Sequence, residues 1–108
     1  MNISYTGEFK RNLRQLIKKY SHIKGDIQPI INTLQQGELL GDRIQYGAYI
    51  VYKVRVKNSD AQRGKSGGYR IIYYLETQTD IILLTIYSKS EQSDISNFEI
   101  KKIIKQLT

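Results

Sequence analysis

The segment YKVRVKNSDAQRGKSGGYRIIYYL, Tyr52 to Leu75, decides the fold, because it predicts two strands joined by a basic, glycine-rich turn. Its first half alternates, which puts cations on one side of an extended strand and apolar side chains on the other. The segment holds six cations against the single acid Asp60: Lys53, Arg55, Lys57, Arg63, Lys65 and Arg70. Like charges at this spacing repel one another unless an anion lies between them. The segment is therefore predicted to bind a polyanion, and a phosphate backbone is the first candidate.

A helical hairpin is predicted before this segment, after a short strand at residues 2–5. Apolar residues recur at helical spacing over residues 7–20 and again over residues 27–34. Pro29 is compatible with the second helix only in its first turn, where Asp26 would be the cap. Because the turn between the helices is short, the two helices are expected to form a hairpin.

Strands and a last helix are predicted for the rest of the chain. The predicted strands cover residues 50–57, 69–75 and 81–87, with a polar connection at 41–47 and a tight turn at 77–80. The run at 81–87 is apolar without alternation, which indicates a strand buried on both faces. Ser96 and Glu99 have the spacing of a capping box at the start of a helix. The order β-α-α-β-β-β-α predicts one α+β domain over residues 1–108, with the N-terminal helical hairpin and the C-terminal helix packed on a small antiparallel sheet.

Composition narrows the possible functions. The net charge of +7 favours nucleic acid or acidic partners. The absence of cysteine excludes disulfides and thiol chemistry, and the single histidine, His22, excludes a His-rich metal site. No apolar run is long enough to span a membrane, and the first ten residues lack the apolar region of a signal peptide. We therefore expect a cytoplasmic protein with no membrane association.

Three motifs resemble those of the RelE/ParE superfamily of toxins from bacterial toxin–antitoxin pairs. They are YKVRV, RGKSGGYRIIYYL and LLTIYSKSEQSDI, behind the helical hairpin, and they look most like the HigB branch. The resemblance covers nearly the whole chain. It implies a small endoribonuclease that cuts mRNA in the ribosomal A site, without a metal or another cofactor. It also implies a partner antitoxin with a helix-turn-helix fold, and contact with operator DNA only through the antitoxin complex.

The same resemblance implies candidate site residues. Lys53 and Arg55 match cations of the second RelE strand, Arg70 matches the arginine that opens the third, and Lys89 matches the lysine after the fourth. This chain departs from RelE at two positions, where Ser90 replaces an arginine and Ser96 replaces a catalytic tyrosine. The HigB-like Y-x-K-x-E pattern is the natural substitute, and it consists of Tyr87, Lys89 and Glu91.

The chemistry of RNA cleavage assigns expected roles to these residues. The 2′-hydroxyl attacks phosphorus, so cations must hold the developing charge, and Arg55 and Arg70 are the best candidates. Lys53 or Glu91 is expected to be the base, and Tyr87 to donate a proton or stack on a base of the RNA. The remaining cations Lys57, Arg63 and Lys65 are expected to hold backbone phosphates.

Several alternatives stay open at this point. The chain is also compatible with a ParE-like toxin that poisons DNA gyrase, or with an inactive relative that only binds RNA or an antitoxin. The strand cations also fit an ordinary solvated face, and Arg70 also fits an ion pair with Glu76, Glu91 or Asp94. Tyrosines such as Tyr87 are more often packing residues than catalytic ones, and His22 is expected to have no part in the function.

Overall fold

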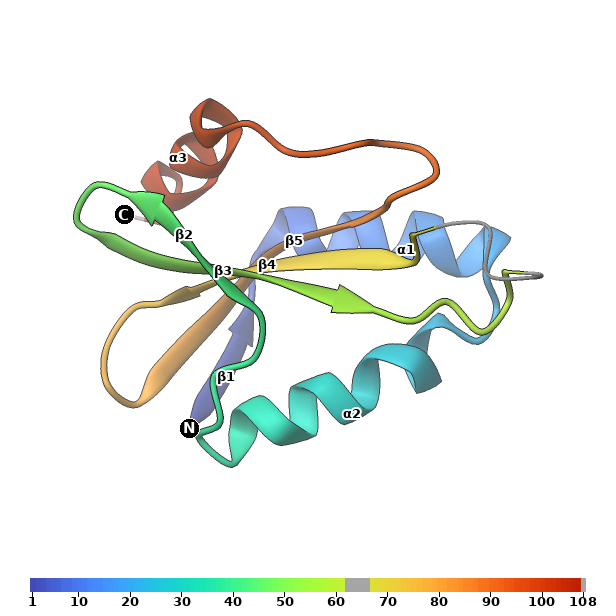
Figure 1. Ribbon diagram of the computed structural model, residues 1–108, viewed down its shortest axis with the longest axis horizontal. Coiled ribbons are helices and arrows are strands. Elements are labelled where there is room, and N and C mark those ends of the chain that lie inside the picture. Colours follow the sequence, from blue (N-terminus) through green and yellow to red (C-terminus); the bar gives the residue numbers. More distant parts are fainter. Residues whose placement is uncertain (62–66, 108) are drawn as a thin grey trace.

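The computed structural model describes residues 1–61 and 67–107, apart from the side chain of Tyr46. Within these residues, three helices lie against one sheet with the strand order β1-β5-β4-β3-β2 (Figure 1). The elements are β1 (Asn2–Tyr5), α1 (Gly7–Lys19), α2 (Ile23–Gln35), β2 (Asp42–Tyr46), β3 (Tyr49–Val56), β4 (Tyr69–Leu75), β5 (Asp80–Ser88) and α3 (Asn97–Lys105). The predicted α+β class is confirmed, and so is the placement of the helices around the sheet.

The sheet is mixed, whereas the sequence predicted an antiparallel one. Strand β1 runs parallel to β5, with Ile3 opposite Ile81 and Tyr5 opposite Leu83. Helix α1 follows β1 directly, and the Thr6 hydroxyl at the junction donates to Leu84 O at 2.6 Å. Because α1 begins immediately after β1, the chain cannot turn back into a hairpin. Strand β1 pairs instead with β5, which is distant in the sequence. The other strand pairs, β2·β3, β3·β4 and β4·β5, are antiparallel.

Residues 41–47 were expected to be a polar connection, and this expectation was wrong for most of them. Residues 42–46 form the edge strand β2, which pairs with β3 and places Arg43 opposite Tyr52 and Ile44 opposite Val51. Ile44 packs on the core, while Arg43 and Gln45 are exposed. A single partly buried residue is enough for this edge strand to pack on the sheet, so its composition resembles that of a loop.

Helix α2 begins earlier than predicted. It starts at Ile23, so Pro29 is its seventh residue and lies beyond the first turn. Asp26 does not cap the helix, and its carboxylate instead accepts hydrogen bonds from the backbone N and the Oγ of Ser59, at 2.9 and 3.0 Å. Ile23 is fully buried, and this burial explains why helical structure extends back through the predicted turn. The helix ends at Gln35, and Gly37 follows its C-cap Gln36 with a φ of 92°, a conformation that favours glycine after a helix.

Two hydrophobic cores sandwich the sheet. The first lies between the sheet and helices α1 and α2, and the second lies between the sheet and α3. Strand β5 contributes to both, because Ile81 and Leu83 face the first core while Ile82 and Leu84 face the second. The predicted burial of this strand on both faces is confirmed. Helix α3 covers only part of its face, and Arg55 on the same side of β3 is exposed.

The cap of α3 gives a first prediction. Ser96 is the N-cap, and its Oγ accepts a hydrogen bond from Glu99 N at 3.1 Å. Substituting Ser96→Ala is expected to lower the free energy of unfolding by ~1 kcal/mol, because the amide of Glu99 loses its partner. Chemical denaturation measures this change, with Ser93→Ala, just before the helix, as the control. A Ser96→Ala protein with parental stability that has lost its activity would show that Ser96 is a catalytic residue instead.

Candidate functional site

Three predicted site residues form one row across the sheet. Arg55 on β3 is opposite Arg70 on β4, and Arg70 is opposite Tyr87 on β5. Directly paired residues project from the same face of a sheet. This is the face that α3 partly covers, because Tyr87 and Val51, four residues before Arg55, both belong to the second core. Lys53, two residues before Arg55, projects from the same face.

Arg70 is held more firmly than the sequence suggested. Only 8% of it is exposed, so it is not a mobile cation on an open face. Its Nη1 donates to the carbonyl oxygens of Gly67 and Tyr69, at 2.5 and 3.1 Å. The ion pairs in the described parts of the chain are Lys19–Glu91, His22–Asp60 and Lys53–Asp94, and none of them includes Arg55 or Arg70. The arrangement therefore presents a fixed guanidinium group without a carboxylate partner among these residues.

Lys89 joins this row through a close approach to Gly67. A Cβ atom added to Gly67 would lie 2.6 Å from Lys89 Cγ and 3.4 Å from Arg70 Nη2. The backbone continues the sheet at this point, since Lys89 N donates to Gly68 O at 2.8 Å. Lys89 Nζ in turn donates to Ser93 O. Glycine at position 67 is therefore what allows Lys89 and Arg70 to lie side by side.

Asp94 belongs to the candidate site, although the sequence analysis did not select it. Its Oδ1 accepts hydrogen bonds from Lys53 Nζ at 2.9 Å, Tyr87 Oη at 3.4 Å and Ile95 N at 2.8 Å. Strand β5 ends at one side of the sheet and α3 lies over another part, so the connection between them runs back across the face (Figure 1). This return path carries Asp94 onto Lys53 and Tyr87. The two strand residues are therefore linked through one carboxylate oxygen.

The charges at this point shift two pKa values in opposite directions. The hydrogen bond from Lys53 lowers the pKa of Asp94 below its ordinary value, with help from the amide of Ile95. Burial raises the pKa of Tyr87 to about 12, and the neighbouring charge of Asp94 adds to this effect, while Arg70 opposes it. At neutral pH Asp94 is therefore an anion, and Tyr87 is a protonated phenol that can donate a proton.

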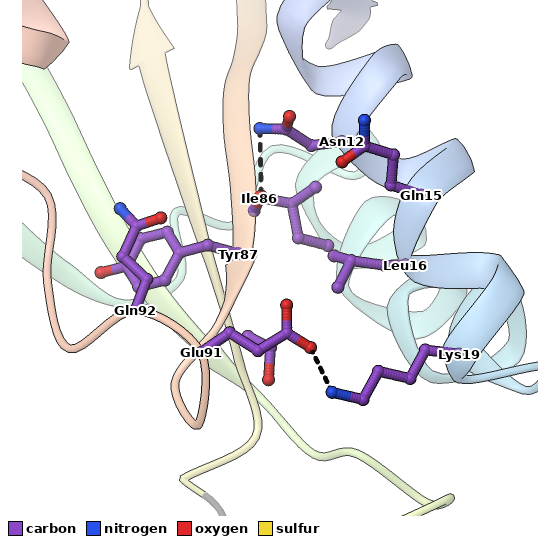
Figure 2. A pocket seen from close by; sticks show the side chains of 9 residues that line it. Asn12, Gln15, Leu16, Lys19, Ile86, Tyr87, Glu91 and Gln92 are labelled. Carbon is purple, nitrogen blue, oxygen red and sulfur yellow. Dashed lines mark hydrogen bonds and ion pairs between the residues drawn. The ribbon is translucent and has the colours of Figure 1, made fainter.

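Glu91 is directed away from the row. Its carboxylate pairs with Lys19 of α1 at 2.9 Å, on the side of β5 opposite to the Tyr87 ring (Figure 2). This contact was not visible in the sequence, where Tyr87, Lys89 and Glu91 looked like one motif. The structure places Tyr87 and Lys89 beside Arg70, whereas Glu91 contacts α1.

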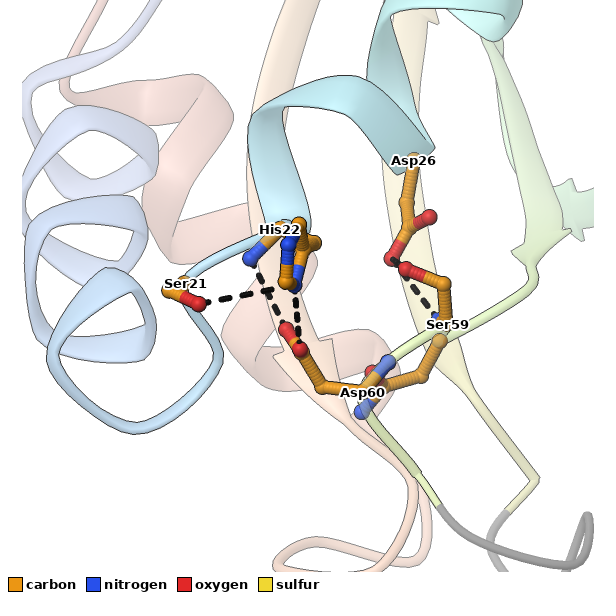
Figure 3. Close-up of polar contacts among 6 residues, drawn as sticks. Ser21, His22, Asp26, Ser59 and Asp60 are labelled. Carbon is orange, nitrogen blue, oxygen red and sulfur yellow. Dashed lines mark hydrogen bonds and ion pairs between the residues drawn. The ribbon is translucent and has the colours of Figure 1, made fainter.

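The segment that follows β3 is tied to the start of α2. Asp60 accepts hydrogen bonds from the backbone N of His22 at 2.8 Å and pairs with its Nδ1 at 2.5 Å, while Asp26 binds Ser59 (Figure 3). Lys57 lies just before these contacts and is exposed. The other two predicted RNA-binding cations, Arg63 and Lys65, lie outside the described residues.

The His22–Asp60 pair predicts a pH-dependent stability. The Asp60 hydrogen bond raises the pKa of His22 above its ordinary 6.5, so this contribution is fully present below 6.5 and is lost as the pH rises through the raised value. The pKa of Asp60 is lowered from 3.8, so its contribution is present above 3.8 and is lost as the pH falls through the lowered value. The pair therefore stabilises the fold most between the ordinary pKa values of 3.8 for Asp60 and 6.5 for His22.

Thermal unfolding of the His22→Ala protein tests this pair. The melting temperature of the parent is expected to exceed that of His22→Ala more at about pH 5.5 than at about pH 9, because only the protonated imidazole forms an ion pair with Asp60. An Asp60→Asn protein should lose the same pH dependence. Equal differences at the two pH values would contradict the assignment.

The composition of the site indicates its chemistry. Among the described residues, the row and its neighbours supply the four cations Lys53, Arg55, Arg70 and Lys89, a buried phenol and the carboxylate of Asp94, on the sheet face that α3 partly covers. Such a set suits an anionic group of several oxygens, because guanidinium groups bind phosphate oxygens in a two-pronged way. Among residues 1–61 and 67–107, no three His, Cys, Asp or Glu side chains gather as metal ligands do. No helix of this part of the chain is long and apolar enough to cross a membrane.

Comparison with known protein families gives a match over the whole chain. The chain matches, over residues 1–108, the sequence model of a family described as the RelE toxin of the RelE/RelB toxin–antitoxin system. No solved structure gives a significant match to the chain.

Proposed function

Because this chain belongs to the RelE toxin family, and is thus the toxin of a toxin–antitoxin pair, we propose that it is a ribosome-dependent endoribonuclease that cuts mRNA and arrests translation. The partner of a toxin in this family is an antitoxin. We propose that this antitoxin is a helix-turn-helix protein and that the toxin meets operator DNA only within their complex.

The row formed by Arg55, Arg70 and Tyr87 is the observation that carries the proposal. Two guanidinium groups from neighbouring strands stand beside a phenol that stays protonated at neutral pH. The negative charge that builds on a phosphate during cleavage is stabilised best by donors already fixed in place. The two carbonyl contacts of Arg70 fix its guanidinium group in this way. A surface that only holds RNA has no need of such a buried arginine.

The proposed reaction is attack by the 2′-oxygen of a ribose on the adjacent phosphorus. The bond from the 2′-oxygen to phosphorus forms, and the bond from phosphorus to the 5′-oxygen breaks. A base removes the proton of the 2′-hydroxyl, and an acid protonates the 5′-oxygen as it leaves. The products are a 2′,3′-cyclic phosphate and a free 5′-hydroxyl. Arg55 and Arg70 stabilise the charge on the phosphate oxygens, and Tyr87 is the proposed acid.

Lys53 is the proposed base, with Asp94 as the residue that positions it. Glu91, the other base suggested by the sequence, is engaged by Lys19 on the far side of β5. Asp94 holds Lys53 and Tyr87 on one oxygen atom, which keeps the two proton-transfer groups close together. Lys53 accepts the proton of the 2′-hydroxyl only as a neutral amine, so its ammonium group must first leave Asp94 and release a proton to solvent.

Translation on programmed ribosomes tests the proposal. The purified protein is expected to cleave mRNA within codons held on the ribosome and to leave naked DNA and gyrase activity unaffected. Cells that express it without the neighbouring antitoxin should stop translating, and co-expression of the antitoxin should restore growth. Intact transcripts together with double-strand breaks in the chromosome would contradict the proposal and favour gyrase poisoning.

A further inference from the structure

A second site lies on the opposite side of the same strand end. A cavity of about 400 Å³ opens between α1 and the segment that follows β5 (Figure 2). It exists because β1 pairs with β5 only as far as Leu83, so no strand of the described residues pairs with the last part of this edge of β5. Asn12 of α1 binds this part of β5 instead. Its Nδ2 donates to Thr85 Oγ1 at 2.9 Å and to Ile86 O at 3.4 Å. The volume lies in the lower part of the range of small-molecule sites.

The lining of this cavity suits an uncharged, polar ligand. Leu16 and Ile86 are buried and supply apolar surface. Asn12 uses its Nδ2 within the protein, and Gln15 makes no hydrogen bond to any residue in the described parts of the chain. Among the described residues, the charged side chains at the wall are Lys19 and Glu91, and they neutralise each other at 2.9 Å. This cavity therefore suits a different ligand from the row of Arg55, Arg70 and Tyr87, which suits an anion.

Amide side chains above an apolar surface have the chemistry that recognises a nucleobase. The amide of Gln15 offers a donor and an acceptor side by side, which matches the edge of a base, and Asn12 adds its Oδ1 as an acceptor. An apolar floor accepts the face of the ring. The cavity is also close to the proposed chemistry, because Ile86 in its wall and Tyr87 in the row are consecutive residues on opposite faces of β5.

We propose that this cavity binds a base of the RNA beside the bond that is cut, and that Gln15 contributes to the base preference. The inference rests on the proposed function, since it places the phosphate at the row of Arg55, Arg70 and Tyr87 and a neighbouring base around the end of β5. The substrate is then held from both faces of one strand. The preference for a particular RNA base then comes from α1, which lies outside the three motifs that resemble the toxin superfamily.

Titration with the four neutral nucleosides tests the cavity without any cleavage. The side-chain NH₂ resonances of Asn12 and Gln15 are followed by NMR, with Gln28 on α2 as the matched control. At least one nucleoside is expected to shift the Asn12 and Gln15 signals in a saturable way and to leave Gln28 unchanged. Inorganic phosphate should leave all three signals unchanged. If no nucleoside moves the Asn12 and Gln15 signals, the proposed base site is wrong.

Cleavage of mRNAs that differ in the bases of one codon supplies the second test. Gln15→Leu keeps the size of the side chain and removes its amide, so the ratio of cleavage rates for the best and worst bases should fall on the order of tenfold. Gln28→Leu should keep the parental ratio. A parental ratio in Gln15→Leu overturns the base site and leaves the nuclease proposal intact. If the parent cleaves no mRNA, the nuclease proposal fails, and the nucleoside titration still decides whether the cavity binds bases.

Discussion

Substituting Arg55→Ala is expected to reduce the single-turnover rate of mRNA cleavage by a factor of ~10²–10³, the usual effect of removing one donor that stabilises the transition state. Arg55 is exposed, and none of the ion pairs or hydrogen bonds found in residues 1–61 and 67–107 involves its side chain. Its loss should therefore leave stability close to the parental value. Saturating ribosomes with the toxin separates the rate of cleavage from the strength of binding.

Lys57→Ala is the matched control for Arg55→Ala. Lys57 is an exposed cation two residues further along, just beyond the end of β3. A residue that only holds a backbone phosphate should mainly weaken binding to the ribosome and flatten its salt dependence. If Arg55→Ala cleaves at the parental rate, or if Lys57→Ala loses as much single-turnover rate as Arg55→Ala, the row does not stabilise the transition state.

Arg70 needs a gentler substitution than Arg55, because it is buried and its guanidinium group holds two carbonyl groups. Arg70→Ala would leave these oxygens without a partner, and would lower stability as well as activity. Arg70→Lys keeps the charge and loses the fixed fork of donors. Arg70→Lys is therefore expected to lower the single-turnover rate of cleavage, as Arg55→Ala does. Circular dichroism checks that the variant still folds.

Tyr87→Phe is expected to lower the cleavage rate by a factor of ~10²–10⁴, which is the usual contribution of a positioned general acid. The ring stays in the second core, so packing is retained and only the hydroxyl group is removed. The measurement is again single-turnover cleavage on saturated ribosomes. Binding to the ribosome should change little, since the hydroxyl group of Tyr87 contacts Asp94 and no exposed surface is removed.

Tyr74→Phe is the control for Tyr87→Phe. Tyr74 packs at the edge of the same core, against the ring of Tyr49, and lies away from the row. Its substitution should leave cleavage at the parental rate. If Tyr87→Phe and Tyr74→Phe cleave equally well, the hydroxyl group of Tyr87 does not donate the proton, and Tyr87 is a packing residue.

The sequence predicted those parts of the fold that have strong periodic signals. The alternation in Tyr52–Val56 set the two faces of β3, and the apolar run at 81–87 identified a strand buried on both sides. The Ser96 cap was also predictable, because a capping box is a local pattern. The row of Arg55 and Arg70 followed from the alternation together with the expected hairpin of two strands.

The remaining features depend on long-range contacts that no local pattern reports. Strand β2 has the composition of a loop, and only its pairing with β3 makes it a strand. The position of Asp94 depends on the return path of the chain from β5 to α3. The pairing of Glu91 with Lys19 joins residues far apart in the sequence, so the Y-x-K-x-E pattern did not indicate it.

The chemistry of the cut ends shows whether the 2′-oxygen attacks phosphorus at the row of Arg55, Arg70 and Tyr87. mRNA held on ribosomes is treated with the purified toxin, and the two new ends are identified by their reactivity with end-specific ligases and kinases. Attack by the 2′-oxygen predicts a 2′,3′-cyclic phosphate on one fragment and a 5′-hydroxyl on the other, with both ends diminished in Arg55→Ala and Tyr87→Phe. A 5′-phosphate and a 3′-hydroxyl, or equal yields from the two variants and the parent, would contradict the claim.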